Sequence, residues 1–194
     1  MLGIIGEEYK DKVFDDKNDK IEIPIKIKTS DKIKLALMKF MRFSNQYTAV
    51  CTEGVRNADV SGIKDNKLIE VEIKISKSDF KNELKHKKWK HEEYANPKEH
   101  LQASGGQHEI PNKFYFCVPI DMEEWALKEL EKINIKYGLL VWEDCGGIGW
   151  IRQRRSAMHI HTEKISQRAL KTFFKRLTSE VINLRLEKMG LEHY

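Results

Sequence analysis

Between Leu68 and Ser76 the chain alternates strictly between two kinds of side chain. Branched apolar residues occupy every second position: Ile69, Val71, Ile73 and Ile75. The positions between them hold two carboxylates and an ammonium: Glu70, Glu72 and Lys74. A period of two predicts a β-strand with one face in the core. The other face then carries three charged groups side by side, either as an ordinary solvated surface or as part of a reactive site.

Alternation, helical spacing and turn residues divide the rest of the chain into elements. Residues 1–20 are charged and irregular, and we expect a mobile lead-in there, followed by one domain over residues 21–194. Strands are predicted at 21–28, 47–52, 57–63, 67–76, 114–118, 137–142 and 148–152. Helices are predicted at 30–42, 76–94, 121–133 and 166–189, with a long irregular loop at 96–112. This order predicts an α/β fold with a mixed sheet between helices.

A tight turn joins two of the predicted strands and sets their register. The Asp65-Asn66 pair tolerates the positive φ that a two-residue turn requires. A slip of one residue would place Val60 opposite Glu72 and mix the apolar and charged faces. The turn therefore predicts these facing pairs: Lys64 and Lys67, Ile63 and Leu68, Gly62 and Ile69, Ser61 and Glu70, Val60 and Val71, Asp59 and Glu72, Ala58 and Ile73.

This register brings acidic side chains close together. Directly opposed β-carbons lie about 5 Å apart, where like charges repel. Asp59 and Glu72 would then form a self-repelling cluster with Glu70 beside them, and Glu53 from the preceding strand could add a further oxygen. Either one acid binds a proton or a cation lies between them, and hard carboxylate oxygens without sulfur suit Mg²⁺ or Mn²⁺. Lys74, on the same face, could hold an attacking water and offset charge on a phosphoryl oxygen.

Composition narrows the class of protein. The chain has 194 residues, of which 40% are hydrophobic and 34% charged, and it contains no run of about 18 apolar residues such as a membrane helix needs. The N-terminal residues do not resemble a secretory signal peptide. Three cysteines without a CxxC pair argue against a zinc knuckle or a disulfide framework, so we expect a reducing, cytoplasmic setting. A formal charge of +5 only weakly favours an anionic partner.

A basic helix is predicted directly after the charged strand. Its Lys81, Lys85 and Lys88 share one side at helical spacing, where they could contact a phosphate backbone. A solvated face balanced by neighbouring acids explains them equally well. Trp89 and Tyr94 could stack on a base, although packing of Trp89 against the sheet is the plainer interpretation.

Two motifs resemble those of the PD-(D/E)XK nuclease superfamily. Ala58-Asp59-Val60 matches its first motif, with alanine where the family has proline, and Glu72-Ile73-Lys74 matches the second. The segments NADVSGI, IEVEIKISKSDF, KWKHEEY and KFYFCVP are similar, in this order, to the MmcB-like branch of DNA-repair nucleases. The resemblance spans residues 33–153 with order and spacing preserved.

The resemblance implies both a fold and an activity. The fold is a restriction-endonuclease-like mixed central sheet with an α-β-β-β-α-β core, flanked by helices and followed by a C-terminal hairpin and helix. The activity is metal-dependent hydrolysis of DNA phosphodiester bonds, in DNA repair or in a mobile element. Asp59 and Glu72 would bind Mg²⁺ or Mn²⁺ and Lys74 would assist the nucleophile, while Glu70 is an auxiliary ligand or a mere neighbour. An RNA endonuclease and a catalytically silent nucleic-acid-binding module are the alternatives.

Overall fold

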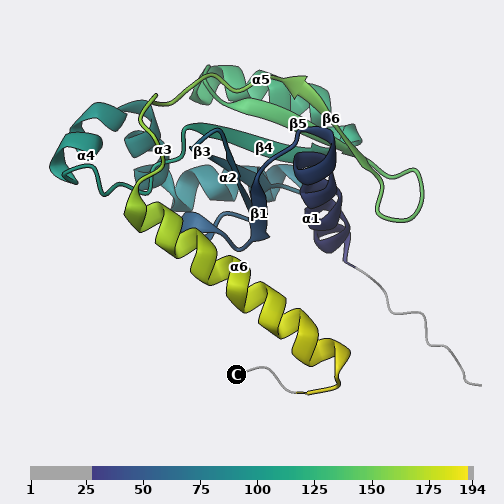
Figure 1. Cartoon of the computed structure of the whole chain (residues 1–194). Coiled ribbons are helices and arrows are strands. Elements are labelled where there is room, and N and C mark those ends of the chain that lie inside the picture. The colour runs from purple at the N-terminus through teal and green to yellow at the C-terminus, as the bar shows by residue number, and fades with distance from the viewer. Residues whose placement is uncertain (1–27, 192–194) are drawn as a thin grey trace, which may run out of the picture.

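The computed structural model describes residues 28–191, which build a six-stranded mixed sheet with helices against both faces (Figure 1). The strands lie across the sheet in sequence order: β1 (Ala49–Thr52), β2 (Val60–Lys64), β3 (Lys67–Ile73), β4 (Lys113–Pro119), β5 (Gly138–Glu143) and β6 (Trp150–Arg155). The helices are α1 (Thr29–Lys39), α2 (Lys77–His86), α3 (Lys88–Ala95), α4 (Pro97–Ala103), α5 (Glu123–Ile133) and α6 (Gln167–Lys188). The predicted α/β architecture with a mixed sheet between helices is confirmed.

The sheet combines antiparallel margins with a parallel centre. β1, β2 and β3 pair antiparallel, β3, β4 and β5 pair parallel, and β6 returns antiparallel to β5. A parallel neighbour requires a crossover connection, which α2, α3 and α4 provide between β3 and β4. This crossover places α2 and α3 over the face of β3 that carries its charged residues.

The hairpin formed by β2 and β3 has the predicted register. Asp65 and Asn66 turn the chain with φ values of 51° and 59°, and the five facing pairs from Lys64 and Lys67 to Val60 and Val71 are present. The ladder ends at Val60, so the two further predicted pairs, Asp59 with Glu72 and Ala58 with Ile73, are not part of it. Asp59 lies just before β2, and its carboxylate oxygen Oδ2 accepts a hydrogen bond from the backbone N–H of Ile73 at 2.7 Å.

The two faces of the sheet bury different layers of core. Ile69 and Val71 of β3 pack with α1 on one face. On the other face, Phe114 and Phe116 of β4 pack with α2, α3 and α5. Glu70 and Glu72 are the β3 neighbours of these two phenylalanines. The charged side of β3 therefore faces a second core, and the interpretation of a solvated strand surface was wrong.

The helix predicted over residues 76–94 is two helices. Ser76 caps α2, since its Oγ accepts a hydrogen bond from the backbone N–H of Asp79 at 3.1 Å. The chain then leaves helical geometry at Lys87, with φ −112° and ψ 32°, before α3 begins. The predicted loop at 96–112 is helical in its first part, because α4 begins at Pro97, a residue suited to a first helical turn.

The C-terminal helix α6 contacts the sheet as far as Glu180, whose carboxylate accepts hydrogen bonds from the backbone N–H and the hydroxyl of Thr52 at 3.0 and 2.9 Å. It begins after Ser166, whose Oγ accepts a hydrogen bond from the N–H of Ala169 at 3.0 Å, and Phe173 is buried against residues of β1. The apolar stripe of α6, from Leu170 to Leu184, continues past the edge of the sheet, where Val181 and Leu184 are exposed (Figure 1). The stripe thus closes the core only in its first half.

Two sequence predictions lie outside the described part of the chain: the lead-in at 1–20 and, apart from Lys28, the strand at 21–28. Among residues 28–191, no helix has both the length and the apolar character needed to cross a membrane.

Candidate active site

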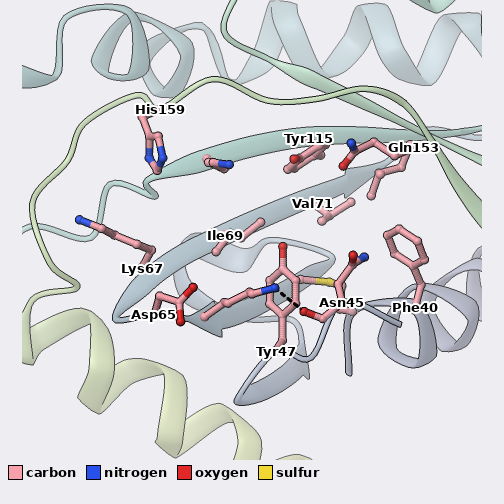
Figure 2. A pocket seen from close by; sticks show the side chains of 14 residues that line it. Phe40, Asn45, Tyr47, Asp65, Lys67, Ile69, Val71, Tyr115, Gln153 and His159 are labelled. Atoms are coloured by element: carbon pink, nitrogen blue, oxygen red, sulfur yellow. Dashed lines mark hydrogen bonds between the residues drawn. The ribbon is translucent and has the colours of Figure 1, made fainter. Parts of the chain in front are cut away.

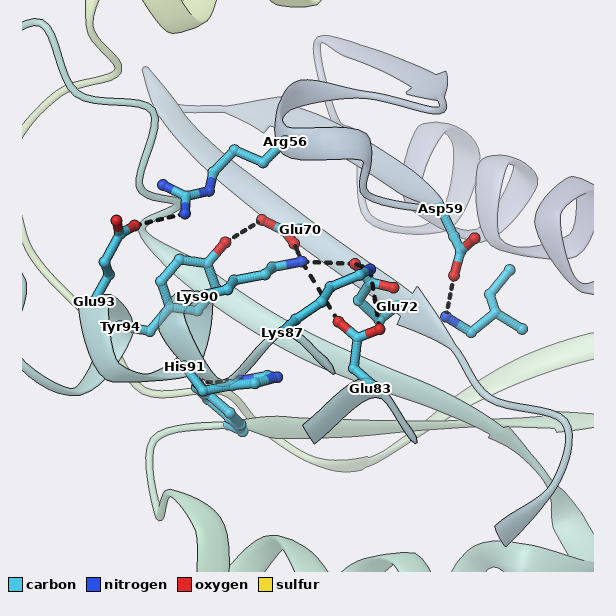
Figure 3. A network of polar contacts seen from close by, with 12 residues as sticks. Arg56, Asp59, Glu70, Glu72, Glu83, Lys87, Lys90, His91, Glu93 and Tyr94 are labelled. Atoms are coloured by element: carbon cyan, nitrogen blue, oxygen red, sulfur yellow. Dashed lines mark hydrogen bonds and ion pairs between the residues drawn. The ribbon is translucent and has the colours of Figure 1, made fainter. Parts of the chain in front are cut away.

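The predicted catalytic residues of β3 lie side by side in the interior. Glu70 and Glu72 point from β3 toward α2 and α3 (Figure 3), and each is only 1% exposed. Lys74 follows the end of the strand and is also buried. Its Nζ lies 3.3 Å from Glu72 Oε2 and 3.0 Å from Glu83 Oε2 on α2. Charges held this far from water need close partners, because an unpaired buried charge is strongly destabilising.

Two lysines around the start of α3 complete the neutralisation of these buried acids. The Nζ of Lys90 contacts Glu70 and lies 2.6 Å from Glu72 Oε1, and the side chain is fully buried. Lys87, at the break before α3, reaches Glu72 at 3.4 Å and Glu83 at 3.0 Å. Three acids therefore face three lysines, and their formal charges cancel. We call this group the acid–lysine cluster: Glu70, Glu72, Lys74, Glu83, Lys87 and Lys90.

Burial and pairing act in opposite directions on the pKa values in the cluster. Burial disfavours the ionised form of Glu72, but the charges of Lys90 and Lys74 outweigh it and lower the pKa of Glu72. Burial likewise disfavours the ammonium of Lys74, but Glu72 and Glu83 outweigh it and raise the pKa of Lys74. At Glu70 the effect of burial is larger than that of the Lys90 charge, so the pKa of Glu70 is raised. Glu72 and Lys74 are thus an ionised pair at neutral pH.

Lys90 and Glu83 were missed as site residues by the sequence prediction. That reasoning considered a proton or a metal ion to relieve the acids and did not consider buried ammonium groups, which contact both Glu70 and Glu72. A signal was present: Phe80, Glu83, Lys87, Lys90 and Tyr94 recur at spacings of three or four, the period of one helix face. Because Phe80 and Tyr94 at its ends are aromatic and buried, the charged residues between them also face inward.

Tyr94 and Trp89 differ from their expected placements. Tyr94, predicted to contact nucleic acid, is fully buried, and its hydroxyl donates a hydrogen bond to Glu70 Oε2 at 2.6 Å. Trp89, expected to pack on the sheet, is 54% exposed. The guanidinium carbon of Arg56 lies 4.8 Å from the centre of its ring. Tyr94 therefore holds an acid in place, while Trp89 presents an aromatic surface to solvent.

The three lysines predicted to contact a phosphate backbone, Lys81, Lys85 and Lys88, are exposed. The break at Lys87 separates Lys81 and Lys85 on α2 from Lys88 on α3, so the single helical row that was predicted does not form. Lys88 makes a surface ion pair with Glu92 at 3.3 Å. These side chains remain accessible to an anion, but as two groups.

Asp59 lies beside the cluster at the end of the loop between β1 and β2 (Figure 3). The loop is sharply folded, with positive φ at Glu53, Arg56 and Asn57. Burial and the negative charge of Glu72 raise the pKa of Asp59 to about 6, although the Ile73 N–H favours its ionised form. Asp59 is therefore an acid whose ionisation a nearby cation would strongly favour.

Asp59 and Glu72 are the acids best placed to hold a divalent metal ion. Within residues 28–191 there is no group of three or more His, Cys, Asp or Glu side chains arranged as a metal site. Glu53 is exposed and contacts Lys34, and Glu70 is engaged by Lys90, so neither predicted auxiliary ligand joins the pair. Two carboxylates still fit Mg²⁺, which usually keeps several waters and takes one or two carboxylates together with substrate phosphates.

Replacing Asp59 by asparagine is expected to stabilise the protein increasingly as the pH rises. The folded-state pKa of about 6 exceeds the ordinary value of 3.8, so ionisation costs the folded state stability between about pH 4 and pH 6, and the full cost is present above that window. Asp59 is only half-buried and solvent screens its charge, so the gain of Asp59→Asn at pH 7 is on the order of 1 kcal/mol. Urea unfolding in EDTA from pH 4 to pH 8 measures it. A difference that does not change with pH would contradict the assignment, and Asp121→Asn, at an exposed acid, serves as the control.

Comparisons with known proteins bear on the fold alone. No protein-family model matches the chain, and no curated protein matches it. It is similar to a solved structure of a protein of unknown function from Silicibacter pomeroyi, with a TM-score of 0.55 and 15% sequence identity. The match covers 84% of this chain and 94% of that one. At this identity the similarity establishes a shared fold.

Proposed function

We propose that this protein is a divalent-metal-dependent nuclease that hydrolyses DNA phosphodiester bonds on a restriction-endonuclease-like core. The observation that carries the proposal is the meeting of Asp59, Glu72 and Lys74 at the end of β3. The Asp59 carboxylate binds the N–H of the residue next to Glu72 at 2.7 Å, and the Lys74 ammonium lies 3.3 Å from Glu72. Two acids and an ammonium side by side suit phosphodiester hydrolysis, which needs a metal site and a group that stabilises developing negative charge.

Asp59 and Glu72 would hold Mg²⁺ or Mn²⁺, which when bound polarises a phosphoryl oxygen and lowers the pKa of water. Lys74 would orient the attacking water and offset the charge that develops on the phosphate. Its ammonium is held between Glu72 and Glu83, so it needs little reorganisation during the reaction, which is the condition for effective electrostatic stabilisation.

Lys87 is the member of the cluster best able to make room for a metal ion. Its side chain is 35% exposed, whereas those of Lys74 and Lys90 are almost fully buried. Its contact with Glu72, at 3.4 Å, is also the longest that Glu72 makes with a lysine. Movement of Lys87 toward a DNA phosphate would remove one of the two ammonium groups at Glu72 Oε1, where Lys90 stays at 2.6 Å. The exposed Lys81, Lys85 and Trp89 would contact the DNA strand without recognising its base sequence.

Labelled duplex and single-stranded DNA, incubated with Mg²⁺, Mn²⁺ or EDTA, test the proposal. We expect cleavage with metal, none in EDTA, and a loss of at least about 100-fold in Asp59→Asn, which keeps an acceptor for the Ile73 N–H but lacks the charge. Asp121→Asn, the same change at an exposed acid, should cleave like the parent. Cleavage that persists in EDTA, or at the parental rate in Asp59→Asn, would contradict the proposal. Selective cleavage of RNA would instead support the alternative of an RNA endonuclease.

One observation favours a second candidate, a catalytically silent nucleic-acid-binding module. Both carboxylate oxygens of Glu72 already contact lysines, so the cluster is electrically balanced without a metal ion. A silent module would show no cleavage with any metal, and its affinity for DNA would rise in Asp59→Asn because a charge that repels phosphate is removed.

A further inference from the structure

A pocket of about 450 Å³ lies on the face of the sheet opposite the acid–lysine cluster (Figure 2). Ile69 and Val71 contribute to its lining, and their side chains point away from those of Glu70 and Glu72 because neighbouring residues of a strand alternate between faces. The pocket is therefore separated from the candidate active site by the sheet itself. A ligand there would not compete for Asp59 or Glu72.

One end of the pocket is basic. Lys67 and His159 lie together at that end (Figure 2), and the Lys67 ammonium donates hydrogen bonds to the backbone carbonyls of Thr162 and Glu163. Lys113 stands opposite Ile69 in the ladder between β3 and β4. Burial, and then the positive charges of Lys113 and Lys67, lower the pKa of His159, as expected for basic groups that are close together. Within residues 28–191, Lys113 makes no ion pair and no side-chain hydrogen bond. Asp65 is the single acid in the lining, so this end suits an anion.

The other end offers aromatic faces and amides. Phe40 and Gln153 lie there, with Tyr115 and Asn45 toward the middle (Figure 2). Tyr115 is buried, and its ring forms part of the inner wall. Aromatic faces stack on any planar base, and each amide supplies both a donor and an acceptor for the edge of a base. This end therefore suits a flat heterocycle.

We propose that this pocket binds a nucleoside monophosphate, with the phosphate at Lys113 and His159, beside Lys67, and the base at the aromatic end. Pockets for ligands of this class enclose roughly 300–1,000 Å³, which includes the size found here. Lys64, the remaining basic residue of the lining, has its ammonium 5.8 Å from the ring of Tyr47 and 2.6 Å from the carbonyl of Asn45. It lies between the two ends, where it can contact a ribose or its phosphate. The site is independent of the proposed cleavage.

Calorimetric titration in EDTA tests the pocket without the metal site. The probes are the nucleoside 5′-monophosphates, the corresponding nucleosides and ribose 5-phosphate. At least one nucleotide should bind about tenfold more tightly than both its nucleoside and ribose 5-phosphate, which lack the phosphate and the base respectively. Lys113→Gln and Gln153→Ala should each weaken the binding about tenfold, and Lys128→Gln, at an exposed lysine of α5, should not.

Two variants keep the test decisive if one of them fails to fold. Gln153 is exposed, so its replacement should be tolerated even if Lys113→Gln is not. The absence of binding by every nucleotide at millimolar concentration would overturn the proposal. Ribose 5-phosphate binding as tightly as the nucleotides would overturn it too, since the base would then contribute nothing. Undiminished binding in both variants would place the nucleotide elsewhere.

Discussion

Replacement of Lys74 by methionine is expected to lower the rate of DNA cleavage by about 10²–10³-fold, the cost of removing one preorganised group that stabilises transition-state charge. Methionine keeps most of the length and packing of the lysine side chain but removes the ammonium beside Glu72 and Glu83. Lys87 and Lys90 still contact Glu72, so the cluster keeps part of its compensation and the fold should survive.

Single-turnover cleavage at saturating enzyme with Mn²⁺ measures this effect separately from DNA affinity. Circular dichroism should show that Lys74→Met is folded, and Lys128→Met on α5 is the matched control at an exposed lysine. Lys74→Arg, which restores a cation, should recover part of the rate. Cleavage by Lys74→Met at the parental rate would show that Lys74 takes no part in the mechanism.

Lys90→Met is expected to destabilise the protein by about 3–5 kcal/mol, the usual cost of breaking a buried ion pair from one side. Lys90 contacts both Glu70 and Glu72, and all three side chains are excluded from water. Without the ammonium, Glu70 would keep its hydrogen bond from Tyr94 but no cation at contact distance within the described residues. The loss should therefore be much larger than for any surface lysine.

Urea unfolding at pH 7 measures this change, with Lys88→Met as the matched control. Lys88 is two residues away, and its ion pair with Glu92 is exposed, so its loss should cost about 0–1 kcal/mol. Adding Glu70→Gln to Lys90→Met should recover part of the stability, because it removes one of the buried carboxylate charges that have lost their ammonium partner. Equal losses in the two lysine variants would mean that Lys90 is not the central counter-ion of Glu70 and Glu72.

The destabilisation expected for Lys90→Met contrasts with the stabilisation expected for Asp59→Asn. Lys90 completes a balanced interior, whereas burial and Glu72 oppose the ionised form of Asp59. A destabilised acid next to a balanced cluster is typical of a site that binds a charged ligand, because functional groups are often held in unfavourable environments.

Local chemistry made much of the fold predictable. The register of β2 and β3 follows from the Asp65-Asn66 turn and a period of two, and both act between near neighbours in sequence. Ser76 marked a helix start for the same reason, since a cap acts within one turn. The break at Lys87 and the helix at 97–103 were not predicted, because packing overrides weak local preferences in short helices.

The sequence by itself determined the strands of the sheet, the pairing of β2 with β3, and the gathering of Glu70, Glu72 and Lys74 on one side of β3. Only the tertiary structure decided that this side is buried, that Lys90 is a counter-ion of Glu70, and that Tyr94 turns inward while Trp89 turns outward. The reason is that alternation and turn geometry act over a few residues. The period of three and four from Phe80 to Tyr94 marks an inward face, but which acid each of its lysines meets depends on how α3 packs across β3.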